Sequence, residues 1–203
     1  MATDTRAQFL NCAEMLFSER GFYGVSIAAI ANELGLTKQA LLHHFGSKEK
    51  LYGEVLKRIS DQFSEIEADI TRDETDPAQR LKTYLLRLHV PFSRGAAPTR
   101  LLMREVLDNK RRADTAGTWY LKPFLDRLTT MVQEVPEWQA ASAVDAFTMV
   151  YQLLGAINYF GISEPTLQGI YGAEAYANIE QGFPAQLEHL IDVVIAAGPK
   201  SKA

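Results

Sequence analysis

The chain has 203 residues, of which 47% are hydrophobic, so it is long enough and apolar enough to bury a substantial core. Its one cysteine, Cys12, excludes an internal disulfide framework and a cysteine-rich zinc module. The net charge of −4 argues against nucleic acid as a partner, but residues 1–60 carry seven Lys/Arg against six Asp/Glu and residues 61–203 carry 14 against 19. Because salt confines each field to about 10 Å, an acidic chain can still present a locally positive face.

The sequence also predicts a soluble, cytoplasmic protein with no membrane partner. The start of the chain lacks the basic-then-apolar pattern of a signal peptide. The longest apolar-rich stretch, residues 144–162, is interrupted by an aspartate, a threonine, a glutamine and an asparagine, which argues against a membrane span.

Apolar residues recur with helical spacing in the N-terminal part of the chain. The predicted helices lie at residues 9–17, 27–34, 37–45 and 48–70. Gly21 stops the first helix, and Ser26 and Thr37 precede the second and third as caps. The charged stretch TRDETDP, residues 71–77, is typical of a connector. We therefore expect a head of residues 1–47, extended by the bridging helix 48–70.

The same helical spacing continues beyond the connector. The predicted helices lie near residues 77–91, 99–109, 121–135 and 137–161, and from residue 184 onward. Residues 162–183 contain several glycines and aromatics, and we expect them to be largely irregular. Strand-type alternation is absent, so the predicted fold class is all-α, with residues 71–203 forming a helical-bundle body.

The stretch LGLTKQALLHHFGSKEKLY, residues 34–52, has the pattern of a helix-turn-helix. Gly35 can take the left-handed conformation that ends one helix, Thr37 can cap the next, and Phe45 turns inward. The outward-facing residues are Lys38, Gln39, Leu42 and His43 or His44. This set is short enough to enter a major groove, and Lys48, at the start of the next helix, is placed to anchor a phosphate.

These residues resemble the head of the TetR family of bacterial repressors. The resemblance is carried by GFYGVS (21–26), IAAIANELGLTKQALLHHF (27–45) and GSKEKL (46–51), while the rest of the chain is similar only in length and helical character. The resemblance implies a three-helix DNA reader followed by a body that binds a small effector and forms a dimer through its last two long helices.

The resemblance also implies roles for single residues. Ser26 and Thr37 match hydroxyl positions that contact phosphates, and Lys48 matches the phosphate lysine. Lys38 and Gln39 match the variable positions that read bases. The complete set of predicted DNA-binding residues is Ser26, Thr37, Lys38, Gln39, Leu42, His43, His44 and Lys48.

One position departs from the family pattern. Leu42 stands where the family usually has a tyrosine that contacts DNA. A leucine can meet a thymine methyl group, but it cannot donate a hydrogen bond. His44 and Phe45 follow the pattern of an aromatic pair, whose first member reaches the DNA backbone and whose second member packs inside.

Candidate effector-binding residues in the body are polar or aromatic residues within apolar surroundings. They are Arg104, Trp119, Tyr120, Phe124, Tyr151 and Asn158. Each has an alternative role: the aromatic residues can form core, Arg104 can pair with Glu105 on its own helix, and Asn158 can form a polar pair across a dimer interface.

The chain shows no pattern for catalysis or metal binding. His43 and His44 point about 100° apart on a helix, and His89 and His189 have no His or Glu at a partner spacing. No phosphate-binding or dinucleotide-binding glycine loop, nucleophile elbow or zinc-protease helix is present. We therefore predict no metal, no cofactor and no enzymatic activity.

The predicted function is that of a homodimeric transcriptional regulator, a repressor that a small molecule releases from its double-stranded operator. We expect a two-fold dimer built on the helices at 137–161 and 184–197. One alternative is a helical architectural module that contacts DNA or protein and has no effector. A helical enzyme is a third reading, and it would require perturbed titratable groups in a body cavity.

Overall fold

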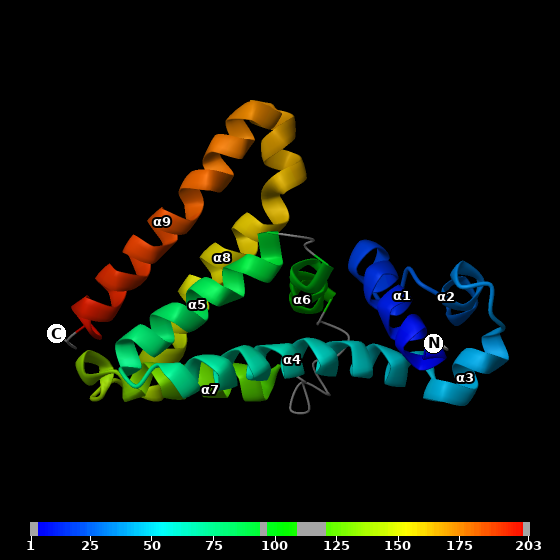
Figure 1. Ribbon diagram of the computed structural model, residues 1–203, viewed down its shortest axis with the longest axis horizontal. Helices are drawn as coiled ribbons and strands as arrows, with labels where there is room; N and C mark the ends of the chain where they lie inside the picture. The colour runs from blue at the N-terminus through cyan, green and yellow to red at the C-terminus, as the bar shows by residue number, and fades with distance from the viewer. Residues whose placement is uncertain (1–3, 94–96, 109–120, 201–203) are drawn as a thin grey trace. The chain divides into compact units, whose positions relative to one another are not determined.

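The computed structural model describes residues 4–93, 97–108 and 121–200, and every regular element in these ranges is a helix (Figure 1). The α-helices are α1 (Thr5–Arg20), α2 (Ile27–Glu33), α3 (Lys38–Phe45), α4 (Lys48–Asp73), α5 (Pro77–Ser93), α6 (Ala97–Asp108), α7 (Lys122–Glu134), α8 (Ala143–Tyr171) and α9 (Ala173–Ala197). The all-α prediction is confirmed. None of the helices in these ranges is both long and apolar enough to cross a membrane.

The described residues form two compact units. The first contains residues 4–62 and α6, and the second contains residues 63–93 and α7 to α9. α4 therefore contributes its N-terminal part to one unit and its C-terminal part to the other. The sequence pattern predicted that α6 belongs to the body, whereas in the structure α6 packs along α1 and belongs to the unit that contains the head.

The first unit begins with short helices whose caps are local in sequence. The Ser26 hydroxyl accepts a hydrogen bond from the Ala29 amide at 3.0 Å, and the Thr37 hydroxyl accepts one from the Ala40 amide at 3.1 Å. Between these helices Gly35 has a φ of +65°, a conformation that glycine adopts without strain. The unit's core includes Phe9, Leu16, Phe17, Ile30, Leu41, Phe45, Leu51 and Val55.

Two side chains of α6, Arg104 and Glu105, form hydrogen bonds with the rest of the first unit. Arg104 donates through Nε to the Ser18 carbonyl at 2.9 Å and through a terminal nitrogen to the Glu19 carbonyl at 2.6 Å. The Tyr52 hydroxyl on α4 donates to the buried Glu105 carboxylate at 2.5 Å. Because Ser18 and Glu19 lie in the last turn of α1, Arg104 satisfies carbonyls that the helix itself leaves without donors.

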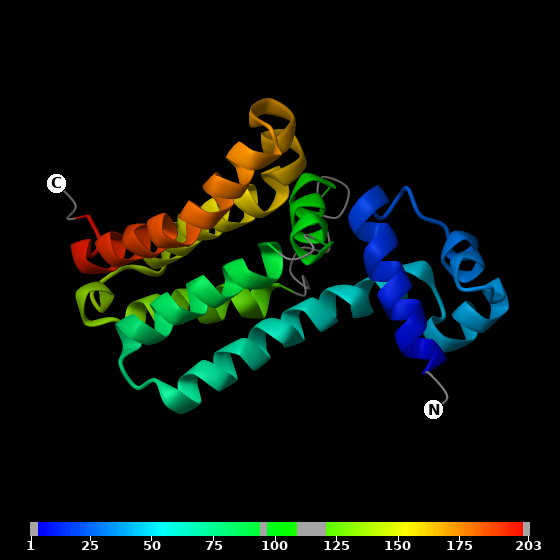
Figure 2. The same ribbon diagram turned by 45° about the horizontal axis from the view of Figure 1, so that its top comes forward.

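The second unit is a bundle in which α5 packs against α7, α8 and α9, and α8 packs against α7 and α9 (Figure 2). Asp76 caps α5 by accepting a hydrogen bond from the Gln79 amide at 2.9 Å. The Trp138 indole N–H donates to the Ile195 carbonyl at 3.1 Å and so ties the turn before α8 to α9. The bundle core includes Leu81, Leu85, Leu88, Leu128, Val132, Val150, Leu153, Ile157, Leu187 and Ile191.

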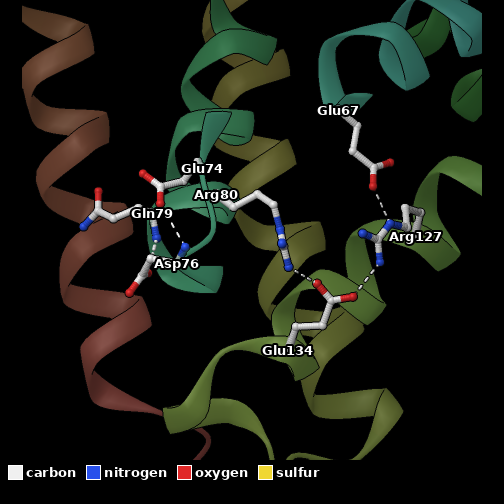
Figure 3. A network of polar contacts seen from close by, with 7 residues as sticks. All are labelled: Glu67, Glu74, Asp76, Gln79, Arg80, Arg127 and Glu134. Carbon is white, nitrogen blue, oxygen red and sulfur yellow. Dashed lines mark hydrogen bonds and ion pairs between the residues drawn. The ribbon is translucent and has the colours of Figure 1, made fainter. Parts of the chain in front are cut away.

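A polar network joins three helices of the second unit (Figure 3). Glu134 at the end of α7 accepts hydrogen bonds from Arg80 of α5 and from Arg127, the latter at 2.7 Å. Arg127 also donates to Glu67 of α4 at 2.5 Å. The C-terminal part of α4 is therefore connected to α7 and α5 through alternating charges.

The prediction that residues 162–183 are irregular is wrong. α8 continues to Tyr171, and α9 begins directly after Gly172, whose φ of +83° makes the turn between them. Pro165 and Pro184 lie inside these helices. A proline removes one helical hydrogen bond and bends a helix, but helix continues on both sides when the flanking residues can pack, and α8 changes direction before the turn (Figure 1).

The start of α8 also differs from the prediction. The helix begins at Ala143 and not at residue 137, and a single 3₁₀ turn occupies Pro136–Trp138. The Ser142 hydroxyl accepts a hydrogen bond from the Asp145 amide at 3.2 Å and donates to its carboxylate at 2.6 Å. This Ser-x-x-Asp pair is a sequence signal for the start of a helix, and helical periodicity alone does not reveal it.

Candidate nucleic-acid interface

α3 is anchored on one side and open to solvent on the other. Leu41 and Phe45 are buried, and the Phe45 ring meets the edge of the Phe9 ring with centroids 6.3 Å apart. The exposed residues of α3 are Lys38, Gln39, His43 and His44, and Leu42 is half-buried. The structure therefore presents the residues that the sequence assigned to base reading on the free side of a short, capped helix, as a major-groove reader requires.

A hollow of about 540 Å³ lies beside α3 at the start of α2. It is lined by residues 23–29, Lys38 and Lys48. Three predicted contacts, Ser26, Lys38 and Lys48, therefore share one concave surface although they come from three different helix starts. A hydroxyl and two ammonium groups around such a surface are the donors that DNA phosphates use.

Lys48 is the first residue of α4, and its ammonium is only partly exposed. Its Nζ lies 4.2 Å from the centroid of the Phe22 ring. Burial lowers the pKa of Lys48, and the neighbouring Glu49 carboxylate opposes that shift. The Ser47 hydroxyl accepts a hydrogen bond from the Lys50 amide at 3.2 Å, so the helix start that carries Lys48 is capped.

Two residues of the hollow were not predicted. Tyr23 is 54% exposed and lies in the turn between α1 and α2, where it forms part of the lining of the hollow. A Cβ atom on Gly24 would lie 2.2 Å from the Arg20 carbonyl oxygen, so this turn accepts only glycine at that position. The signal for both was the GFYG sequence, which places an aromatic pair between two glycines.

The two adjacent histidines of α3 occupy different environments. The His44 ring contacts Phe9 with centroids 5.9 Å apart, and the His43 and His44 rings are nearly perpendicular, at 83°. Across the described ranges, no cluster of three or more His, Cys, Asp or Glu side chains could hold a metal ion.

Residues 9–55 match the family model for bacterial regulatory proteins of the tetR family. The head of the chain is therefore of the TetR type. The matched residues run from α1 to the first turns of α4, so they include the whole helix-turn-helix and the hollow beside it. The likeness to the family model thus lies in the head, which has the helix-turn-helix of a DNA-binding regulator.

Curated relatives and a solved structure extend this likeness. The chain is 34% identical over 91 residues to the HTH-type transcriptional regulator LmrA of Bacillus subtilis (strain 168), covering 44% of this chain and about half (48%) of LmrA. It is 26% identical over 166 residues to RutR of Escherichia coli (strain K12), covering 81% and 77% of the two chains. The crystal structure of AibR in complex with isovaleryl coenzyme A and operator DNA superposes with a TM-score of 0.60 at 22% identity, over 77% of this chain and 85% of that one, which shows a shared fold.

The predicted effector-binding residues do not gather in one compact unit of the chain. Arg104 lies in the first unit, where its guanidinium is engaged by α1 carbonyls, whereas Phe124, Tyr151 and Asn158 lie in the second. Trp119 and Tyr120 lie outside the described residues.

The three candidates in the second unit differ in their surroundings. The Phe124 ring lies 4.4 Å from the Phe63 ring, between centroids, and is half-buried. Tyr151 is exposed on α8 and stacks on Phe147, so it faces outward. The Asn158 side-chain oxygen is buried and has no hydrogen-bond partner among the described residues. Asn158 alone therefore combines an apolar setting with an unused polar atom.

Proposed function

We propose that this regulator is a homodimeric repressor that a small molecule releases from its operator. The observation that carries the proposal is the shared surface of Ser26, Lys38 and Lys48 beside the exposed side of α3. It combines donors for the DNA backbone with Gln39, which is exposed and suited to base edges. The hollow and the exposed side of α3 together thus provide both functions that operator recognition requires.

Exposed apolar side chains on α8 and α9 support a dimer. They include Val144, Phe147, Tyr151, Tyr159, Leu190 and Val193, and Val144 is 73% exposed. Two copies of the paired helices α8 and α9 would form a four-helix bundle, burying about 1,200 Å² or more in total.

The repressor dimer would exist in two conformations that differ in the distance between its two heads, and the effector would shift the population from one to the other. Two heads of a dimer read successive major grooves, which are about 34 Å apart. An effector bound in the second unit, with the unused Asn158 oxygen accepting one of its donors, would favour a spacing that no longer fits. AibR, which was solved with a coenzyme A thioester and operator DNA, supports the pairing of these two ligands on this fold.

Selection from randomised DNA duplexes tests the proposed recognition. Gln39→Ala should change the preference at one or two base pairs by about 1–3 kcal/mol each, because a base contact is lost. Lys48→Ala should weaken selected and random duplexes alike and reduce the salt dependence by about one unit per head, because a phosphate contact is lost. Uniform weakening by Gln39→Ala would contradict the assignment of base reading to this residue.

Light scattering at micromolar concentration tests the dimer. The wild-type chain should scatter as a dimer, and Phe147→Glu should shift it toward a monomer because a charge would be buried in the interface. Thr130→Glu, on the exposed side of α7, is the matched control and should leave the dimer intact. A monomeric wild-type protein would refute both the dimer and the two-groove mechanism.

A further inference from the structure

The contact between Lys48 and Phe22 joins two residues that lie far apart in the sequence. Phe22 lies in the turn between α1 and α2, and Lys48 begins α4. The Lys48 ammonium nitrogen lies 4.2 Å from the centroid of the Phe22 ring, well within the range of a cation–π contact. We propose that Phe22 is a positioning residue, which holds the Lys48 ammonium where a DNA phosphate binds. This inference rests on the proposed function, because it assumes that Lys48 contacts DNA.

The Phe22 ring is itself held in place. It stacks on Phe17 at an interplanar angle of 25° and meets Tyr52 at a steep angle of 66°, with centroids 6.1 and 5.0 Å apart. Phe17 and Tyr52 are almost completely buried. A ring packed against two core aromatics has little freedom to turn, so it offers the ammonium a fixed platform.

The platform places the ammonium at the hollow beside the recognition helix. Lys48 lines that hollow together with Ser26 and Lys38. The ammonium has already lost part of its water in this position, and its burial lowers the pKa of Lys48. A phosphate entering the hollow therefore meets a cation that is partly desolvated and fixed in place.

The expected contribution comes from conformational freedom. An exposed lysine samples many rotamers, and fixing a side chain of this kind on binding costs about 0.5–1.5 kcal/mol. Because the Phe22 ring already restrains Lys48 in the free protein, the side chain loses little further conformational entropy when DNA binds. Loss of the ring should therefore weaken binding about two- to tenfold per head, while the number of phosphate contacts stays the same.

A double-mutant cycle separates positioning from a merely structural role. The variants are Phe22→Leu, Lys48→Met and the double variant, each titrated against a fluorescein-labelled duplex of random sequence over a series of potassium chloride concentrations. Phe22→Leu should weaken binding about two- to tenfold per head with an unchanged salt slope, because the lysine charge is kept. In the Lys48→Met background the same substitution should have an effect of less than about twofold. Phe22→Tyr, a single substitution that keeps an aromatic ring at this position, should bind DNA with wild-type affinity.

Each failure has a separate meaning. Equal weakening by Phe22→Leu in both backgrounds would overturn the inference, because the ring would then act only on the fold. If Lys48→Met alone leaves affinity and salt slope unchanged, the phosphate contact in the proposed function is wrong. If Phe22→Leu fails to fold by circular dichroism, trifluorophenylalanine at position 22 keeps the ring's shape and removes its negative face. Wild-type affinity of that protein would overturn the inference, and weaker binding that depends on Lys48 would support it.

Discussion

Replacing Glu134 by glutamine should destabilise the second unit. The Glu134 carboxylate accepts from Arg80 through one oxygen and from Arg127 through the other (Figure 3). Glutamine has one oxygen and one amino group, so one of the two arginines would face a donor in place of an acceptor. Arg80 has only 15% of its side chain exposed, and its Nε already has no partner among the described residues, so it has little access to water as a substitute.

The expected loss in the free energy of unfolding depends on how deeply Glu134 and its two arginine partners are buried. An exposed ion pair contributes about 0–1 kcal/mol, whereas breaking a fully buried one costs about 3–5 kcal/mol. Glu134 is 32% exposed and therefore lies between these limits. We expect the free energy of unfolding at pH 7 to fall by about 1–3 kcal/mol in Glu134→Gln.

The pH dependence gives this prediction a second readout. Burial alone would raise the pKa of Glu134, but hydrogen bonds and charge from Arg127 and Arg80 outweigh it, so the pKa lies below its ordinary value of 4.5. A carboxylate with a depressed folded pKa stabilises the protein above the unfolded pKa and loses that effect as the pH falls through the folded pKa. The difference between wild type and Glu134→Gln should therefore be complete above about pH 4.5 and shrink at lower pH.

Urea unfolding followed by circular dichroism at a series of pH values measures both effects. Glu137→Gln is the matched control, because Glu137 is exposed and makes no ion pair among the described residues. It should change the free energy of unfolding by no more than about 0.5 kcal/mol. A loss in Glu134→Gln as small as in the control, or a difference from wild type that does not shrink below pH 4.5, would refute the reasoning.

Three further predictions concern other contacts. His89 is 6% exposed, and its Nδ1 atom has no hydrogen-bond partner among the described residues. Burial lowers the pKa of His89, although the charge of Glu180 opposes the shift. Below about pH 6.5 this histidine therefore binds more protons in the unfolded state than in the folded state, and the protein loses stability. Chemical denaturation at pH 7 and 5.5 should show a smaller loss of stability on acidification in His89→Leu than in wild type. Gly24→Ala should lower the melting temperature and weaken DNA binding, since the added Cβ meets the Arg20 carbonyl. Arg104→Met should cost about 1–3 kcal/mol in urea unfolding, because two α1 carbonyls lose their donors.

The recognition helix could be located from the sequence because its determinants are local. The hydroxyls of Ser26 and Thr37 bond amides three residues ahead, and the left-handed Gly35 separates the two helices. Caps and helical periodicity operate over a few residues and depend little on the rest of the chain. The predicted exposure of Lys38 and Gln39 followed from the same periodicity.

The helical course of residues 162–183 could not be derived from local rules. Glycine disfavours helix in an isolated segment, and the several glycines among residues 162–183 led to the prediction of an irregular stretch. The structure keeps helix through both prolines, and Tyr176 and Phe183 pack toward Phe160. Tertiary packing of this kind outweighs a local preference of about 3 kcal/mol or less per residue.

The sequence by itself determined the fold class, the helix-turn-helix and the likeness of the head to the TetR family, because each follows from residue spacing within short segments. Only the tertiary structure decided that Lys48 lies over Phe22, that Glu134 joins Arg80 to Arg127, and that Arg104 holds the end of α1. These partners belong to different helices, and their meeting depends on how the helices pack. Periodicity reports which side of a helix is buried, but it carries no information about which side chain of another helix lies opposite.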